Sequence, residues 1–370
     1  MLQYLYIKKR NEISKMFNTN EVQVNVINHI GLIKLNRQKA LNALSLDMIK
    51  KISYYLDLWE EDPSVAAVLI KSKHPTSFCS GGDIKSIYLN NDAYRDEYLA
   101  NQYLMDYHIH TYSKPVISLL NGIVFGGGVG LGLAASHKVA TEHIRLAMPE
   151  TKIGFFPDVG TTRMLNDLPD YIGRYIALLG VELDVDDVSY LKLTNYSINS
   201  NDLKTLEKEL FSFHWRIETV YDDLDYLLKK YNNESIGESK IKMMKNEIMR
   251  VFSKDSIEEM LLESKDTWIE TQLEKQSPTA LCITYELLKS TKDKSLYECF
   301  KFEHNLSRHV TQTHDFKEGV RSLLVDKDQR FLYQPKEIKE VKTADIEKLF
   351  DFSEFEKVHI MDKIKLSPKL

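Results

Sequence analysis

The sequence predicts an α/β fold, and three observations support this class. Short apolar strands alternate with helices over the first 200 residues, and glycine-rich loops follow two of those strands. Beyond about Leu203 the chain changes to long, charged amphipathic segments with few glycines. With 370 residues, 43% of them hydrophobic, the chain can bury a large core. The strand, loop and helix order recurs without a fixed period, so no solenoid repeat is predicted.

The first elements are a hairpin and a helix. The alternation VQVNVINHIGLIKLNR predicts two half-buried strands joined by a turn at Asn28 to Gly31. Ser45 can cap a helix that ends before Pro63. The apolar positions of this helix are spaced by three and four residues, at Ile49, Ile52, Leu56 and Trp59.

The next segments predict buried strands separated by loops and helices. VAAVLIKS is a strand, the loop 73–82 follows it, and a tyrosine-rich helical stretch extends to about Tyr112. After Pro115 comes the strand VISLL. Beyond Gly122 the order recurs as a glycine-rich turn, a helix over VGLGLAAS and a strand over KVATEHIRLAM.

We therefore expect four regions. Residues 1–20 form an N-terminal extension, and residues 21–205 form the α/β core that carries the site. Residues 206–335 form a mainly helical region that covers the site, and residues 336–370 form a polar, lysine-rich tail that packs loosely.

Composition excludes several classes of function. The net charge of −5 comes from interspersed acidic and basic residues, so no basic face favours nucleic acid. The three cysteines form no CxxC pair, which argues against a disulfide framework and a cysteine zinc site. No apolar run approaches the roughly 20 residues that span a membrane. We expect neither a nucleic-acid nor a membrane partner.

The first 15 residues leave the compartment open. They lack the apolar region of a secretory signal, and Lys8, Lys9, Arg10 and Lys15 outnumber Glu12. This segment is either a frayed terminus before a start at Met16 or a short basic targeting peptide. The first alternative predicts a cytoplasmic protein, and the second predicts the mitochondrial matrix.

Two loops combine glycine with little charge, FCSGGDIKSI and NGIVFGGGVGLGLAAS. Glycines after buried strands can expose backbone N–H groups to a ligand, and a helix that starts there adds a favourable dipole. Two such N–H groups could converge as an oxyanion hole. The alternatives are tight turns alone, or a dinucleotide loop, because Gly130 to Ala135 satisfies the permissive GxGxxA form. No GK[ST] sequence follows, so a P-loop is not predicted.

The stretch MPETKIGFFPDVG places Glu150 and Asp158 eight positions apart among apolar residues. Alone, Glu150 would be an ordinary helix-end carboxylate, and Asp158 would form an Asx turn after Pro157. Burial would raise the pKa of either carboxyl group, which suits acid–base chemistry near neutral pH.

Three histidines and one cysteine could be mistaken for metal ligands or a nucleophile, and we predict structural roles for them. His304, His309 and His314 recur every five residues, which does not keep them on one helical face, so we predict a helix surface and no metal site. Cys79 has no identifiable histidine partner and is predicted to be a small buried thiol.

Taken together, six segments resemble the crotonase (enoyl-CoA hydratase/isomerase) superfamily, in the order in which that family has them. The last three of these segments resemble its hydrolase branch. The segments are LNRQKALNALS, FCSGGDIK, KPVISLLNGIVFGGGVGLGL, MPETKIGFFPDVG, SPTAL and HDFKEGVRSLLVDKDQ. The resemblance implies a spiral of ββα units followed by a helical region over the active site, and hydrolysis of an acyl-CoA thioester, most directly 3-hydroxyisobutyryl-CoA.

The resemblance also implies roles for particular residues. The backbone N–H groups of Gly82 and Gly127 would form the oxyanion hole, and Glu150 and Asp158 would be the catalytic acidic pair. The residues expected along the acyl-CoA are Ser80, Gly81, Asp83, Ile84, Lys85, Gln102 and Gly126. No separate cofactor is expected, because coenzyme A is part of the substrate, and self-association is a further expectation from the family.

Two positions depart from the family pattern. Hydrolases of the branch carry a glutamate where this chain has Gln102, and hydratases carry a second glutamate where it has Gly130. Gly130 therefore disfavours the first alternative, an enoyl-CoA hydratase or isomerase. Gln102 leaves room for the second, a catalytically silent scaffold subunit. A third, a nicotinamide-binding oxidoreductase, would need an acidic residue after the second strand.

Overall fold

Two β-sheets lie within residues 22–198 of the computed structural model, which describes residues 19–233, 237–353, 355 and 361. The larger sheet has the strand order β1-β2-β3-β5-β7-β9, and the smaller has the order β4-β6-β8. Strands β1 and β2 are antiparallel, and the other paired strands are parallel. The larger sheet comprises β1 (Val22–Ile27), β2 (Ile30–Leu35), β3 (Ala67–Ser72), β5 (Val116–Leu120), β7 (His137–Thr141) and β9 (Tyr196–Ile198), and the smaller comprises β4 (Ser77–Cys79), β6 (Ile123–Phe125) and β8 (Arg145–Ala147).

From β3 onward, consecutive strands alternate between the two sheets. β3, β5 and β7 join the larger sheet, and each is followed by a short strand of the smaller sheet. A helical segment then follows each pair: α3 (Ile84–Leu89), α5 (Gly127–Leu133) and η2 (Glu150–Ile153), the last a 3-10 helix. This repetition is the expected spiral of ββα units, so the predicted fold class is confirmed.

The predicted hairpin and first helix are both present. Asn28 and His29 adopt positive φ angles of 46° and 67° in the turn between β1 and β2. Helix α2 (Leu46–Glu60) begins after Ser45, whose side chain accepts a hydrogen bond from the Met48 N–H at 3.2 Å. Its apolar stripe is buried against the sheet, as the spacing predicts.

Three details differ from the sequence-based prediction. The short strands β4 and β6 lie in segments that we expected to be loop or turn, because three residues give no measurable alternation. The strand expected over residues 138–148 is two strands, β7 and β8, separated by a turn in which the Ile144 N–H donates to the Thr141 carbonyl. The tyrosine-rich stretch forms α3 and α4 (Asp92–His110), with Asn91 capping α4.

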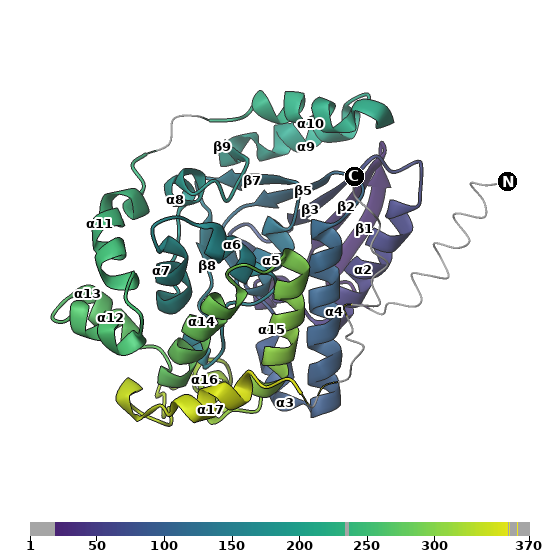
Figure 1. Cartoon of the computed structure of the whole chain (residues 1–370). Coiled ribbons are helices and arrows are strands. Elements are labelled where there is room, and N and C mark those ends of the chain that lie inside the picture. Colours follow the sequence, from purple (N-terminus) through teal and green to yellow (C-terminus); the bar gives the residue numbers. More distant parts are fainter. Residues whose placement is uncertain (1–18, 234–236, 354, 356–360, 362–370) are drawn as a thin grey trace.

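Helices cover both faces of the larger sheet (Figure 1). Helices α9 (Leu203–Ser212) and α10 (Val220–Lys229) lie over one face, where their leucines pack on Ile30, Leu32 and Leu69. The smaller sheet, α2 and α4 lie on the other side. The segment between β8 and β9 forms three further helices, α6 (Thr161–Asp167), α7 (Ile172–Leu179) and α8 (Val185–Tyr190).

The C-terminal helices pack against the core, and α15 (Leu296–Val310) runs beside α4 (Figure 1). The helices of this region are α11 (Lys240–Phe252), α12 (Ile257–Glu263), α13 (Trp268–Leu273), α14 (Pro278–Thr291), α15 (Leu296–Val310), α16 (His314–Val320) and α17 (Thr343–Leu349). A π-helical turn, η5 (Arg321–Val325), continues α16. None of the helices in the described part of the chain has the length and apolar character needed to cross a bilayer.

The expectation of a loosely packed tail after Pro335 is wrong for its described part. Helix α17 packs against α14 and α15, and Ile338 and Ile346 are buried. These two isoleucines, eight positions apart among charged residues, supply the apolar contacts. The expected extension 1–20 lies almost entirely outside the described residues, as do the basic residues on which its targeting interpretation depends.

We expect Ser45→Ala to lower the free energy of unfolding by about 1 to 2 kcal/mol, because an N-cap acceptor of α2 is lost. Ser45 also donates to Glu21 at 2.7 Å, which adds to this cost. Urea denaturation followed by circular dichroism measures the change. Ser53→Ala, inside the same helix, is the matched control and should leave stability within about 0.5 kcal/mol. Equal effects from both substitutions would contradict the capping assignment.

Candidate active site

Three loops meet at one edge of the smaller sheet. They follow β4, β6 and β8 and carry Ser80–Asp83, Gly126–Gly127 and Pro149–Glu150. These strands are parallel neighbours, so their carboxyl ends lie together, as is usual for ligand sites on parallel sheets. The loops border a cavity of about 600 Å³, large enough for a sizeable part of a small-molecule ligand.

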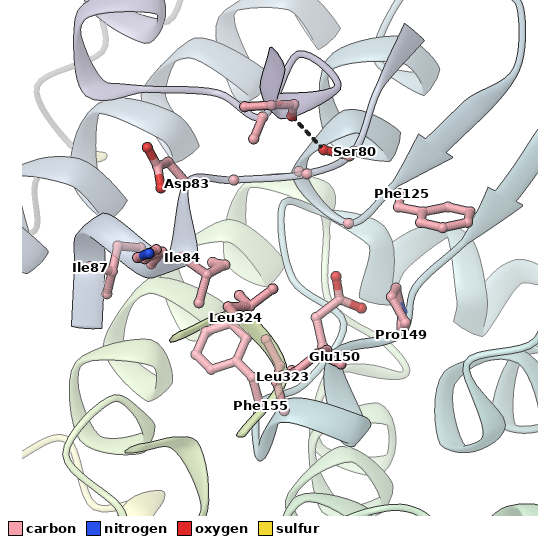
Figure 2. Close-up of a pocket in the computed structure, with 18 of the residues that line it drawn as sticks. Ser80, Asp83, Ile84, Ile87, Phe125, Pro149, Glu150, Phe155, Leu323 and Leu324 are labelled. Atoms are coloured by element: carbon pink, nitrogen blue, oxygen red, sulfur yellow. Dashed lines mark hydrogen bonds between the residues drawn. The ribbon is translucent and has the colours of Figure 1, made fainter. Parts of the chain in front are cut away.

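All the predicted site residues line this one cavity. They are Ser80, Gly81, Gly82, Asp83, Ile84, Lys85, Gln102, Gly126, Gly127, Glu150 and Asp158. In Figure 2 the carboxyl group of Glu150 lies between the loop carrying Ser80 and Asp83 and the apolar side chains of Phe155, Leu323 and Leu324. The two leucines belong to η5, so the C-terminal region supplies one wall of the cavity.

Sequence reasoning missed a group of cations at the same cavity. Arg37, Lys39, Lys152 and Lys327 line it together with the predicted Lys85. Arg37 is paired with Asp83 at 2.8 Å and with Glu21 at 2.9 Å. These residues come from four distant segments, and a sequence with interspersed charge gives no signal that they converge.

Gly82 and Gly127 lie next to each other across the cavity edge. A Cβ atom built on Gly127 would lie only 3.1 Å from the backbone nitrogen of Gly82. Gly127 is also the first residue of α5, and the first N–H groups of a helix have no acceptor within that helix. The two loops therefore bring two backbone donors to one place, which is the geometry that an oxyanion hole requires.

Glu150 is buried at the start of η2, with its carboxyl group against Gly126. A Cβ atom at Gly126 would lie 2.6 Å from Oε1, so only glycine leaves space there for this carboxyl group. Within the described residues, Oε2 has no hydrogen-bond partner. Burial, and then the charge of Asp158, raise the pKa of Glu150 well above its ordinary value.

Asp158 is buried beside α4. The hydroxyl of Tyr103 donates a hydrogen bond of 2.7 Å to its Oδ2 atom. Burial raises the pKa of Asp158 to about 7, and the hydrogen bond from Tyr103 opposes that rise because it stabilises the ionised form. Tyr103 is fully buried, and no sequence pattern distinguishes it from the other tyrosines of this segment.

Two more buried acids flank Asp158, and neither was anticipated. Asp106 on α4 is fully buried, and burial raises its pKa well above the ordinary value. The side chain of Gln102 opposes this rise, but within the described part of the chain neither carboxyl oxygen accepts a hydrogen bond of normal geometry. Glu303 on α15 is also fully buried, and burial raises its pKa to about 8. Two carboxyl groups of the cavity lining and two beside it are therefore withdrawn from water.

The structure shows what surrounds Gly130 and Gln102, the two residues that depart from the family pattern. A Cβ atom at Gly130 would lie 2.7 Å from Cβ of Val159 and 2.8 Å from Oδ2 of Asp106, so a glutamate does not fit there. Gln102 is buried with its amide against Gly127. It is thus a neutral group beside the two backbone donors.

Asp83 has structural partners that the sequence did not reveal. Besides the ion pair with Arg37, its Oδ1 atom accepts the Ser86 N–H at 3.2 Å and caps α3. Its carboxyl group therefore fixes the loop that carries Gly82.

The segments SPTAL and HDFKEG support the Glu150 turn from the C-terminal side. Ser277 caps α14, donates its backbone N–H to the Thr151 carbonyl at 3.1 Å, and donates its hydroxyl to Asp315 at 2.5 Å. Asp315 in turn accepts the Gln334 N–H. These two motifs therefore anchor the residues next to Glu150.

The prediction that His304 lies on a helix surface is wrong. His304 is buried on α15 with its ring edge-on to Tyr103, and not on a helix surface, because α15 packs on α4 at this point. Cys79 is fully buried, as predicted, and burial raises its pKa to about 12. No cluster of three or more metal-binding side chains occurs among the residues that the structure describes.

Comparison with known proteins agrees with this geometry. The family model described as enoyl-CoA hydratase/isomerase matches residues 30–350. Among solved structures, a carnitinyl-CoA dehydratase from Mycobacterium thermoresistibile has a TM-score of 0.85 at 28% identity and covers 94% of this chain and 100% of its own. An enoyl-CoA hydratase from Rhodobacter sphaeroides 2.4.1 has a TM-score of 0.81 at 27% identity, covering 90% and 97%.

Sequence relatives of higher identity are named hydrolases. 3-Hydroxyisobutyryl-CoA hydrolase, mitochondrial, from Xenopus laevis is 37% identical over 86% of both chains. The rat protein of the same name is 34% identical over 95% of this chain and 92% of its own, and the human protein is 35% identical over 86% of both. The chain therefore belongs to the enoyl-CoA hydratase/isomerase (crotonase) family and, within it, to the group of enzymes named 3-hydroxyisobutyryl-CoA hydrolase.

Proposed function

We propose that this enzyme hydrolyses 3-hydroxyisobutyryl-CoA to 3-hydroxyisobutyrate and free coenzyme A, a step of valine breakdown. The observation that carries the proposal is the buried pair Glu150 and Asp158 facing the same cavity as Gly82 and Gly127. The names of the relatives support this substrate.

The two glycines would stabilise the charge that develops during hydrolysis. Attack on the thioester carbonyl moves negative charge onto its oxygen. The N–H groups of Gly82 and Gly127 would donate to that oxygen in a site withdrawn from water. Each donor of this kind lowers the barrier by roughly 3 kcal/mol.

Glu150 would supply the reactive carboxylate. It would either remove a proton from water as the water adds to the carbonyl carbon, or add to that carbon itself and form an anhydride that water then cleaves. In both routes the C–S bond breaks and the coenzyme A thiolate takes up a proton. The Oε2 atom of Glu150 has no hydrogen-bond partner among the described residues, which supports a role for Glu150 as proton acceptor. Asp158 would orient the acyl hydroxyl or the water.

The cations around the cavity would hold the coenzyme A portion of the substrate. Lys39, Lys85, Lys152 and Lys327 come from different elements, and phosphate groups are the natural partners of such a set. The apolar wall of Phe155, Leu323 and Leu324 would contact the acyl group. The proposal includes no separate cofactor, because coenzyme A arrives with the substrate.

The two family alternatives have less support. The similar solved structures are named a dehydratase and a hydratase, but they are 27 to 28% identical, whereas the relatives named hydrolases reach 37%. The packing of Val159 and Asp106 against Gly130 also disfavours a second glutamate there. Retention of both Glu150 and Asp158 at one cavity disfavours a silent scaffold.

The location and the assembly of the enzyme are further parts of the proposal. The vertebrate relatives are named mitochondrial, which favours the matrix over the cytoplasm. Self-association follows from the family resemblance, and sedimentation of the purified protein tests it.

We expect the purified protein to release free thiol rapidly from (S)-3-hydroxyisobutyryl-CoA, with little hydration of crotonyl-CoA. Glu150→Gln and Asp158→Asn should each lower kcat/KM by at least about 100-fold, because a group acting in the transition state is removed. Thiol release followed with a chromogenic disulfide, beside crotonyl-CoA absorbance, measures both reactions.

Asp187→Asn is the control for this assay, since Asp187 is a buried carboxylate that does not line the cavity. It should retain wild-type kcat/KM. Absence of thiol release from wild-type protein with this and related hydroxyacyl-CoA substrates would contradict the proposal. Fast hydration would assign the protein to the hydratases, and silence in both assays would favour the scaffold.

The pH dependence of kcat/KM should report the acidic pair. We expect kcat/KM to rise with pH as both carboxyl groups lose their protons, with one ionisation near 7 from Asp158 and another from Glu150, whose pKa also lies well above its ordinary value. Tyr103→Phe removes the hydrogen bond that stabilises the ionised carboxylate, so the pKa of Asp158 should increase and the midpoint of the ionisation near 7 should move to higher pH. Profiles of kcat/KM from about pH 5 to 9 measure this shift.

Tyr112→Phe provides the matched control. The Tyr112 hydroxyl is also buried and donates to the Leu56 carbonyl at 2.7 Å, but it does not line the cavity. Its loss should leave the midpoint unchanged. A Tyr103→Phe midpoint at or below the wild-type value would contradict the assigned hydrogen bond.

A further inference from the structure

The turn that carries Asp158 has an unusual backbone. Val159 has a φ angle of 55° and Gly160 a φ angle of 80°, so two consecutive residues lie in the left-handed region. A β-branched residue rarely adopts this conformation, because its side chain crowds the backbone. Such strain persists only where surrounding contacts enforce it. Contacts from other parts of the chain must therefore hold this backbone conformation, and with it the direction of the neighbouring Asp158 side chain.

Two helices enclose this turn. On one side Val159 packs against Gly130 of α5, and on the other Phe300 of α15 lies against Gly160. Phe300 and Tyr103 are also in edge contact, with ring centroids 6.2 Å apart. Because α15 belongs to the C-terminal region, the turn is held between the core and the region that covers it.

Glu303 makes the polar contacts that hold the turn. Its Oε2 atom accepts the Gly160 N–H at 2.7 Å, and its Oε1 atom accepts the Thr162 N–H at 3.3 Å and a short hydrogen bond from the Thr162 hydroxyl. Three donors from residues 160 and 162 thus converge on one carboxyl group. They satisfy N–H groups at the start of α6, which otherwise lack acceptors.

Among the residues that the structure describes, Glu303 forms no ion pair. It is fully buried, and burial and then the charge of Asp158 raise its pKa, whereas the hydrogen bonds from Thr162 and Gly160 oppose that rise. A buried acid of this kind is unfavourable unless its hydrogen bonds are needed. Here those hydrogen bonds all go to the turn that follows Asp158.

We propose that Glu303 is a positioning residue for thioester hydrolysis: from α15 it fixes the strained turn at Val159 and Gly160, and thereby aims the Asp158 carboxyl group into the cavity. This inference rests on the proposed function of the Glu150 and Asp158 pair. Glu303 does not line the cavity and acts through the backbone of its neighbours. Tyr103 would complete the arrangement, since it holds the carboxyl group while Glu303 holds the backbone.

The test compares kcat and KM for thiol release from (S)-3-hydroxyisobutyryl-CoA in two variants of the full chain. Glu303→Ala should lower kcat by about 100-fold, because a displaced catalytic group of this kind costs about that factor. KM should change by less than about threefold, since the cavity lining is unaltered. Glu303→Gln keeps an oxygen that accepts the Gly160 N–H, and should recover kcat to within about tenfold of wild type.

Asp187 offers a matched control. It is a buried carboxylate that also fixes a neighbouring segment, accepting the Ser239 hydroxyl at 2.7 Å and the Ile241 N–H at 3.1 Å, but away from the cavity. Asp187→Ala should lower the melting temperature as Glu303→Ala does and leave kcat near wild type. A general loss of stability would lower kcat in both variants, and that result would overturn the proposal.

Two further outcomes are decisive. If Glu303→Ala does not fold, Glu303→Gln and Thr162→Val replace it, and both should lower kcat more than they change KM. If kcat is unchanged in folded Glu303→Ala, or in both replacement variants, the inference about Glu303 is overturned. An active wild-type protein would still support the proposed function in that case. A wild-type protein that releases no thiol overturns the proposed function, and the inference falls with it.

Discussion

The withdrawal of four carboxyl groups from water is the constraint on which the arrangement of this protein depends. Glu150, Asp158, Asp106 and Glu303 are all buried, and burial raises the pKa of each. Burying an acid is costly unless donors surround it or it remains protonated. Asp158 and Glu303 have such donors, whereas Asp106 and one oxygen of Glu150 accept no hydrogen bond of normal geometry from the described residues. The helices α4, α5 and α15 meet around these groups.

The smaller sheet brings the loops of the candidate site together. Its three strands are only three residues long, yet their parallel order puts the ends of three loops together. The larger sheet supplies the core on which these loops rest. The C-terminal region then closes the cavity with Leu323 and Leu324, and fixes the Glu150 turn through Ser277 and Asp315. The site is therefore shared between two regions that the sequence distinguishes by their composition.

The sequence predicted the fold where its patterns are long and periodic. The hairpin, α2, β3 and β5 have clear alternation or helical spacing, whereas β4 and β6 are too short to show either. The glycine loops, Glu150 and Asp158 could be predicted because they stand in recognisable motifs, whereas most cations of the cavity could not. Tyr103, Asp106 and Glu303 could not be predicted, because each lies in a polar helical segment with no motif around it. These residues come together only when α4 and α15 pack against each other. The same packing explains why His304 is buried.

The hydrogen bond between Gly160 and Glu303 joins residues 143 positions apart in the chain. During synthesis on the ribosome, the sheets and the glycine loops emerge first, and the turn after Asp158 then exists without the carboxyl group that holds it. That turn can reach its final conformation only after α15 has been made and has docked on α4. The nascent chain can therefore complete most of its sheet structure before the turn that carries Asp158 is held, so the proposed active site would be completed late in folding.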